Sequence, residues 1–212
     1  AAYDPSWAPL EYTDTETGMF SGVTSDLLST FSRYTGLRFR FEPIDQAEAL
    51  EKVKKGLIDM VCSVTGDYLW DERNKMYTTR YYLRAPTMLV RTKQPHTIER
   101  IALQGGYWFS EHVAADHPGK EIIFYKNVRE CFDALLKGDA DAVYANVYVT
   151  NYLLTERRYE SLAATSMSKY TSEICFGISK CADPRLLSIL DKCIQYTAPE
   201  RMDELVLKNT TK

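Results

Sequence analysis

Residues 55–61 read KGLIDMV, and residues 137–143 read KGDADAV, so the same pattern occurs twice in the chain. In both copies an amphipathic run ends at a Lys-Gly pair, and a short apolar run begins just after an aspartate. Glycine suits the position after a helix because it enters the left-handed region without Cβ strain. Each copy therefore predicts a helix, a glycine cap, a tight turn and a buried strand. Two such units far apart predict two similar α/β lobes.

The composition is that of an ordinary globular protein. The chain has 212 residues, of which 45% are hydrophobic and 26% are charged, and this length suits two lobes of roughly 100 residues each. The net charge of −3 gives no electrostatic footprint for nucleic acid or an anionic membrane, and no apolar run is long enough to predict a membrane span. The five cysteines form no CxxC motif and no metal-spaced Cys/His cluster, so we expect neither a metal nor a cofactor.

Strand-like and helix-like segments alternate along the chain. In the first lobe we expect helices at 25–34 and 46–55 and strands at 38–41, 58–63 and 87–91. In the second lobe we expect strands at 101–103, 122–125 and 142–146 and helices at 131–136, at 147–154 and from Trp108. Residues 173–179 form an extended run, and two helices that begin near Pro184 and Pro199 have no sheet of their own, so we expect them to pack on the first lobe.

These elements predict an α/β fold with two lobes and two hinge crossings. Lobe one comprises residues 1–91 and 180–212, lobe two comprises residues 96–172, and the hinge segments are 92–95 and 173–179. We expect Val61 and Val143, one in each copy of the repeated unit, to lie in separate sheets. Two lobes that are joined by two crossings enclose a cleft suited to a small ligand.

The N-terminal stretch carries a resemblance to a known family. Residues 3–12 (YDPSWAPLEY), 18–22 (GMFSG) and 26–28 (DLL) resemble the opening of the periplasmic solute-binding proteins of the amino-acid-binding type, family 3. Residues 72–73 (ER), residues 81–82 (YY) and both Lys-Gly-x-x-Asp units fall where that family has their counterparts. The resemblance covers essentially the whole chain. It implies a Venus-flytrap, type II periplasmic-binding-protein-like fold that closes on an amino-acid-like or carboxylate ligand outside the cytoplasm.

The chain also departs from the transport proteins of this family. Residues 65–73 (TGDYLWDER) form a longer connection and look like the solute-binding sensor domains of bacterial histidine kinases or diguanylate cyclases, and residues 204–212 lack the Trp-containing end of the transport proteins. We therefore expect the ligand-sensing ectodomain of a membrane receptor, which would be tethered through segments outside this chain and could dimerise. The substrate-binding component of an ABC transporter is the alternative.

Several candidate ligand-binding residues follow from their position in the expected fold. Ser63, Thr65 and Asn146 come at the carboxyl ends of strands, where α/β lobes place their ligands. Gly106 and Tyr107 begin the first helix of lobe two, where free backbone N–H groups could receive an anion, although a simple flexible turn is the alternative.

Other candidates follow from the resemblance. Arg73 falls at the position that binds the ligand carboxylate, where guanidinium offers two parallel donors, although Arg80 and Arg84 compete with it and a solvated surface arginine is the alternative. Asp4 and Trp7 fall where the resemblance places a polar contact and an aromatic wall; a turn-forming Asp-Pro pair and a core tryptophan are their alternatives.

Asn146 is the sharpest departure from the amino-acid binders. The matching position in that family is usually an aspartate that pairs with the ligand ammonium, whereas asparagine is neutral and offers both a donor and an acceptor. The substitution weakens the case for a free α-amino acid and leaves a carboxylate, an amide, a modified amino acid and a nucleoside-like ligand open.

An enzyme is the rival interpretation. The three histidines form no motif, and the chain has no HExxH, GxSxG, P-loop or GxGxxG sequence. The two-lobed fold resembles that of the cyclohexadienyl and arogenate dehydratases, but such a reaction needs a positioned acid that the sequence does not single out. We therefore expect a binding protein with no catalytic residue.

Overall fold

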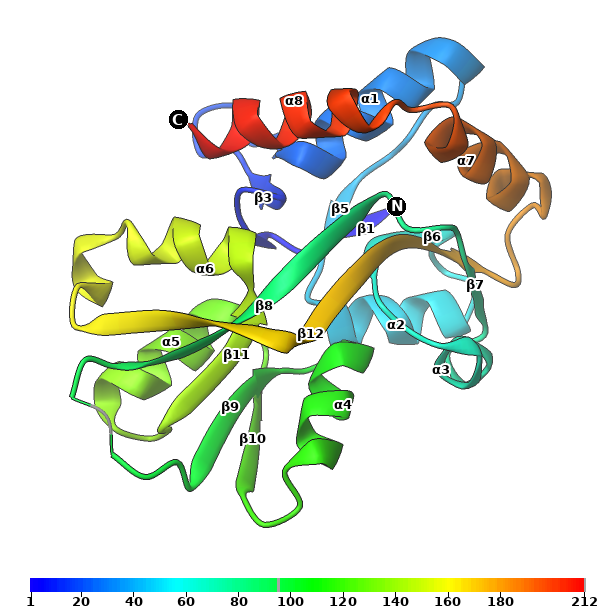
Figure 1. Ribbon diagram of the computed structural model, residues 1–212. Coiled ribbons are helices and arrows are strands. Elements are labelled where there is room, and N and C mark those ends of the chain that lie inside the picture. Colours follow the sequence, from blue (N-terminus) through cyan, green and yellow to red (C-terminus); the bar gives the residue numbers. More distant parts are fainter. Residues whose placement is uncertain (95, 212) are drawn as a thin grey trace.

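The computed structural model describes residues 1–94 and 96–211. In Figure 1 the helices and strands gather into two groups on either side of two long strands that run side by side, β8 (Leu83–Thr92) and β12 (Leu162–Ser179). We call these groups lobe one and lobe two. Pro95, in the expected hinge segment 92–95, and Lys212, at the expected end of lobe one, lie outside the described residues.

Lobe one contains both ends of the described chain. Its strands are β1 (Ala2–Tyr3), β2 (Ser6–Trp7), β3 (Glu11–Thr13), β4 (Phe20–Ser21), β5 (Glu42–Pro43), β6 (Met60–Val64) and β7 (Met76–Thr78). Its helices are α1 (Val23–Thr35), α2 (Gln46–Lys54), α3 (Tyr68–Arg73), α7 (Arg185–Gln195) and α8 (Pro199–Thr210). Helices α7 and α8 lie against α1, and Lys208 and Asn209 on α8 both donate to the Asp26 carboxylate on α1, at 2.9 and 3.0 Å. The C-terminal helices thus pack on α1, and the assignment of residues 180–212 to lobe one stays a prediction.

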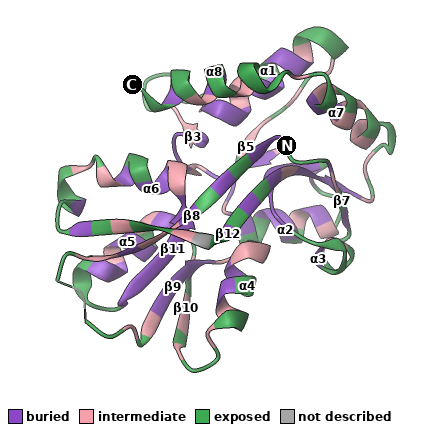
Figure 2. Ribbon diagram, in the orientation of Figure 1, coloured by how far each residue is buried: buried purple, intermediate pink, exposed green. Residues whose placement is uncertain are grey.

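Lobe two is a parallel sheet with helices around it. Its strands are β9 (Arg100–Gln104), β10 (Glu121–Tyr125) and β11 (Ala142–Asn146), and β9 pairs in parallel with both of the others. Its helices are α4 (Trp108–Asp116), α5 (Val128–Lys137), α6 (Val147–Leu154) and the 3-10 turn η1 (Arg157–Tyr159). Buried residues follow β9, β11 and the inner sides of the helices (Figure 2).

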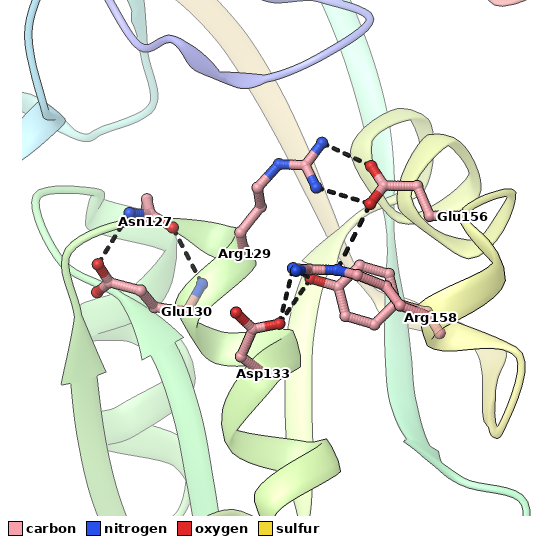
Figure 3. Close-up of polar contacts among 7 residues, drawn as sticks. Asn127, Arg129, Glu130, Asp133, Glu156 and Arg158 are labelled. Carbon is pink, nitrogen blue, oxygen red and sulfur yellow. Dashed lines mark hydrogen bonds and ion pairs between the residues drawn. The ribbon is translucent and has the colours of Figure 1, made fainter.

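Polar contacts fix α5 within lobe two (Figure 3). The Asn127 side chain accepts from the Glu130 backbone N–H at 3.0 Å, which is the first bond of the capping box that the spacing of these residues predicts. The Glu130 carboxylate accepts from the Asn127 side-chain amide at 3.1 Å, rather than from the Asn127 backbone N–H of a capping box. Arg129 pairs with Glu156 at 2.6 Å, so the start of α5 is also tied to the turn that follows α6. These contacts give the helix that borders the cleft a fixed starting point.

The repeated unit folds as its sequence predicts. Helices α2 and α5 end at Lys54 and Lys137, and the glycines that follow have positive φ angles, 69° at Gly56 and 78° at Gly138. Strands β6 and β11 then begin after the aspartates. The strand expected at 38–41 is wrong: pairing with β1 begins only at Glu42, because β1 offers just two residues to a parallel neighbour.

The expectation of separate sheets is also wrong. One hydrogen-bonded path runs β10-β9-β11-β8-β12-β6-β1-β5, so Val61 on β6 and Val143 on β11 share a continuous sheet. The path is continuous because β12 pairs with β8 over its first part and with β6 near its end. Residues 87–90, expected in lobe one, pair antiparallel with β11 of lobe two. The crossing strands therefore belong to both lobes, and the exact lobe boundaries stay a prediction.

Candidate functional site

A small cavity lies between the lobes at the carboxyl ends of β6, β9 and β11. Its volume is about 30 Å³, which is far below the roughly 300–1,000 Å³ of ordinary small-molecule pockets. It is lined by Trp7, Thr65, Gln104, Tyr107, Phe109, Ser110, Val128, Cys131, Tyr144, Ala145, Asn146, Val149 and Ser172. None of these lining side chains carries a charge: they are aromatic, aliphatic or polar, and Cys131 is a thiol. Burial raises the pKa of this thiol and so keeps it neutral.

Side chains from the two lobes meet directly at one wall of this cavity. The Trp7 ring of lobe one stacks on the Tyr107 ring of lobe two, with centroids 4.6 Å apart and an interplanar angle of 9°. The Trp7 indole N–H donates to the Gln104 side-chain oxygen at 2.8 Å. The aromatic wall and the first helix of lobe two are therefore already in contact.

The Asp4 carboxylate is the polar centre of this contact. Two donors come from its own lobe, the Ser6 backbone N–H at 2.9 Å and the Ser6 hydroxyl at 2.7 Å. Two more come from lobe two, the Gln104 amide at 2.6 Å and the Tyr107 hydroxyl at 3.2 Å. Asp4 is 1% exposed, and burial raises its pKa although all four hydrogen bonds favour the ionised form.

A second buried carboxyl group, Glu11, lies behind Asp4. Its Oε2 accepts from the Asp4 backbone N–H at 2.9 Å, while its Oε1 has no hydrogen-bond partner among the described residues. Burial, followed by the repulsion of Asp4, raises the pKa of Glu11 to about 8. Glu11 therefore keeps its proton to a higher pH than an ordinary glutamate, and the protonated group can donate a hydrogen bond.

The backbones of the two lobes also meet beside the cavity. Gly106, which links β9 to α4, has a φ angle of 85° and faces the start of α2. A Cβ atom at this position would lie 2.6 Å from the Ala47 backbone nitrogen. Only glycine fits this approach of the lobes without a shift of the backbone.

The family model of the bacterial extracellular solute-binding proteins, family 3, matches residues 1–208. The chain belongs to this family. No curated protein matches the sequence. Solved structures confirm the two-lobed Venus-flytrap fold that the sequence predicts for this family-3 domain.

Three of these structures share 18–19% sequence identity with the chain, so the likeness concerns the fold. An ancestral arginine-binding protein bound to glutamine has a TM-score of 0.85, and the match covers 100% of this chain and 96% of that one. The periplasmic VFT2 domain of Bordetella pertussis BvgS also has a TM-score of 0.85, and the match covers 98% of this chain and 91% of that one. The substrate-binding protein of an amino acid ABC transporter has a TM-score of 0.85, and the match covers 100% of this chain and 98% of that one.

Five of the candidate residues reach the cavity or the lobe contact. Trp7, Thr65, Tyr107 and Asn146 line the cavity, and Gly106 makes the backbone contact with α2. Asn146 also caps α6, since its Oδ1 accepts from the Val149 backbone N–H at 3.0 Å. Its amide group is the part that remains for a ligand.

Two candidates lie just outside the lining set. Asp4 contacts the lining residues Gln104 and Tyr107, as described above. Ser63 is buried beneath the site, where its hydroxyl faces the Glu11 carboxyl group and the Tyr107 hydroxyl. The buried Thr65 hydroxyl has no hydrogen-bond partner among the described residues, so it is available to a bound water or solute.

Arg73 is not among the residues that line the cavity. It is the last residue of α3, its side chain is 57% exposed, and it donates to the Glu111 carboxylate of α4 at 2.5 Å. Its competitors are also engaged elsewhere, Arg80 with Asp191 and Arg84 with Glu173. The structure therefore places no arginine in the position of a carboxylate clamp within the described residues.

Sequence reasoning missed Gln104 and Glu11. Gln104 ends β9 immediately before the Gly105-Gly106 turn, so the rule that placed Ser63 and Asn146 at strand ends could have found it. Glu11 gives no such signal, because its burial depends on the packing of the β2–β3 hairpin over lobe one.

The described part of the chain offers no metal site. It contains no group of three or more His, Cys, Asp or Glu side chains that could hold a metal ion. Among its helices, none has both the length and the apolar character that a membrane span requires.

Proposed function

We propose that this domain binds a small solute between its lobes outside the cytoplasm, as the sensor ectodomain of a bacterial membrane receptor. The carrying observation is the cavity at the carboxyl ends of β6, β9 and β11, which both lobes line. Ligands of α/β lobes bind at such strand ends. Binding of the solute would change the relative position of the lobes, and this change is what a receptor transmits.

The lining favours an uncharged solute with a flat face and hydrogen-bonding groups. Trp7, Tyr107 and Tyr144 offer aromatic surface, and Asn146 offers both a donor and an acceptor. With Arg73 paired to Glu111, a carboxylate ligand has no guanidinium partner at this site. An amide or a nucleoside-like solute therefore fits better than a free amino acid.

The likeness to the BvgS periplasmic domain supports the sensor role, and the likeness to the ABC-transporter binding protein keeps transport as the second candidate. The two roles are separated in the native host. Deletion of a transport component abolishes uptake of the solute, whereas deletion of a receptor leaves uptake intact and abolishes a transcriptional response to the solute.

An enzymatic role is less well supported. Asp4 and Glu11 are acids near the cleft, but neither lines the cavity. A reaction would need one of these groups at the substrate. NMR spectra of the solute, recorded for hours in the presence of the protein, distinguish the two roles. A binding protein leaves the solute unchanged, whereas an enzyme converts it to a product.

The test is a thermal-shift screen of amides, nucleosides, carboxylates and amino acids, followed by calorimetry on each hit. A solute that binds only the folded state raises the melting temperature. Asn146→Asp keeps the acceptor that caps α6, so it should alter the affinity for a hit by tenfold or more through its changed donor. Asn151→Asp, on the exposed side of the same helix, is the matched control. The proposal fails if no solute shifts the melting temperature, or if both variants bind the hit as the wild type does.

A further inference from the structure

The cleft of this domain is filled by its own side chains. The space left between the lobes measures about 30 Å³, whereas pockets for small molecules usually measure roughly 300–1,000 Å³. A cavity of this size is too small for an amide or a nucleoside. A solute can enter only if residues that now contact each other across the cleft separate.

Tyr107 occupies the place that the geometry offers to a ligand. Its ring lies flat against Trp7 of the opposite lobe, and its hydroxyl donates to the Asp4 carboxylate. A flat solute with a hydrogen-bond donor would make the same two contacts. Gln104 completes the arrangement, because its amide bridges the Trp7 indole and Asp4.

We propose that Gln104 and Tyr107 are built-in occupants of the cleft: they hold the lobes closed with no solute bound, and a solute binds by displacing them from Asp4 and Trp7. The inference rests on the proposed binding function, since it describes how the same cleft is regulated. A solute would then favour a more open arrangement of the lobes than the empty domain adopts.

The balance of hydrogen bonds explains why the closed form is stable without a solute. Opening removes two of the four donors to Asp4 and exposes its carboxylate, and it breaks the stacking of two large aromatic rings. Hydrogen bonds to a charged group are stronger than those between neutral groups. The carboxylate thus gains its last two partners only when the lobes meet.

Two ion pairs at the rim of the cleft also favour the closed form. Arg73 of α3 pairs with Glu111 of α4 at 2.5 Å, and Asp45 before α2 pairs with Lys126 after β10 at 2.8 Å. Both pairs join lobe one to lobe two. The Arg73–Glu111 pair is exposed, and the Lys126 side chain of the second pair is 66% exposed, so both pairs are weak. The closed form therefore depends chiefly on the buried contacts of Gln104 and Tyr107.

The test replaces the Gln104 amide by a carboxyl group of the same shape. In Gln104→Glu the side chain can still accept from Trp7, but it lacks the amide donor to Asp4 and places a second carboxylate beside it. Two adjacent buried carboxyl groups cannot both ionise, so closure of the variant requires a shared proton. Glu11 is the other titratable acid that faces Asp4, and it is present in both proteins.

Both proteins are unfolded in denaturant, dialysed to remove any bound solute and refolded, and their radii of gyration are measured by small-angle X-ray scattering. The wild type should match the scattering profile calculated for the closed structure. Gln104→Glu should be expanded at about pH 9 and return to the wild-type radius at about pH 5, where the pair holds its proton. Gln195→Glu, the same change on the exposed end of α7, should follow the wild type at both pH values.

Two results would overturn the inference. An expanded wild type after removal of solute would show that the lobes need a ligand to close. A Gln104→Glu variant as compact as the wild type at about pH 9 would show that the bridging amide does not hold them. If Gln104→Glu fails to refold, Tyr107→Ala, which removes the stacked ring and its hydroxyl, takes its place. The solute screen is independent of these outcomes: a solute that binds an expanded wild type refutes the self-closed cleft and leaves the binding function standing.

Discussion

Gly106→Ala should open the cleft without altering any polar group in it. The added Cβ would lie 2.6 Å from the Ala47 nitrogen and 2.9 Å from the Ala47 Cα, both backbone atoms at the start of α2 in the opposite lobe. Backbone atoms cannot turn aside as a side chain can, so the lobes themselves must separate. The clash exists only in the closed form, and the substitution therefore acts on the balance between closed and open forms.

The size of the effect follows from two separable terms. The positive φ of 85° costs an alanine about 1–2 kcal/mol in both forms, which lowers the free energy of unfolding without moving the lobes. The clash with Ala47 adds about 1–3 kcal/mol in the closed form alone. This second term lowers the ratio of closed to open molecules about 5- to 150-fold.

Gly138→Ala is the matched control. Gly138 has a φ angle of 78°, and a Cβ atom there would meet nothing within 4 Å. Urea unfolding should show a similar loss of stability in both variants, whereas small-angle scattering should show expansion in Gly106→Ala alone. The reasoning is refuted if Gly106→Ala keeps the wild-type radius of gyration, or if Gly138→Ala expands to the same extent.

Three further predictions concern single side chains. Asn146→Ala should lower the free energy of unfolding by about 0.5–2 kcal/mol in urea because α6 loses its cap, whereas Asn146→Asp should retain that stability. Arg73→Ala should change the affinity for a solute hit by less than tenfold in calorimetry, because its exposed pair with Glu111 contributes less than about 1 kcal/mol; a larger loss would return Arg73 to the site. The wild type should lose stability as the pH rises from 4.5, the ordinary pKa of Glu11, to about 8, because over this range the unfolded chain releases a proton that the folded chain keeps. Glu11→Gln should flatten this dependence in urea unfolding, and an unchanged pH profile would contradict the assignment.

The sequence predicted the local structure of the repeated unit well. Gly56 and Gly138 have the positive φ angles that the Lys-Gly pairs indicate, and Asn127 caps α5 with Glu130. These features depend on residues within one or two turns of each other, so their spacing alone carries the information. The single sheet that joins Val61 to Val143 was missed because two long strands shared by both lobes cannot be seen in local periodicity.

The candidate site could be predicted only where it depends on the position of a residue along its own strand. Strand ends place Thr65 and Asn146 at the cavity, as the general rule for α/β lobes expects. The surroundings of Arg73 and Gln104 depend on how closely the lobes approach, because their partners Glu111 and Asp4 come from the opposite lobe. The order of motifs that suggested a carboxylate clamp at Arg73 contains no information on how closely the two lobes approach each other.

The most direct measurement is a crystal structure of the domain with the solute that gives the largest thermal shift. We expect the solute to lie between the ends of β6 and β11, with its flat face on Trp7 and with the Tyr107 hydroxyl displaced from Asp4. A solute bound elsewhere on the molecule would contradict the binding function. A solute bound in the cleft with the contact between Tyr107 and Asp4 unchanged would contradict the displacement of the built-in occupants.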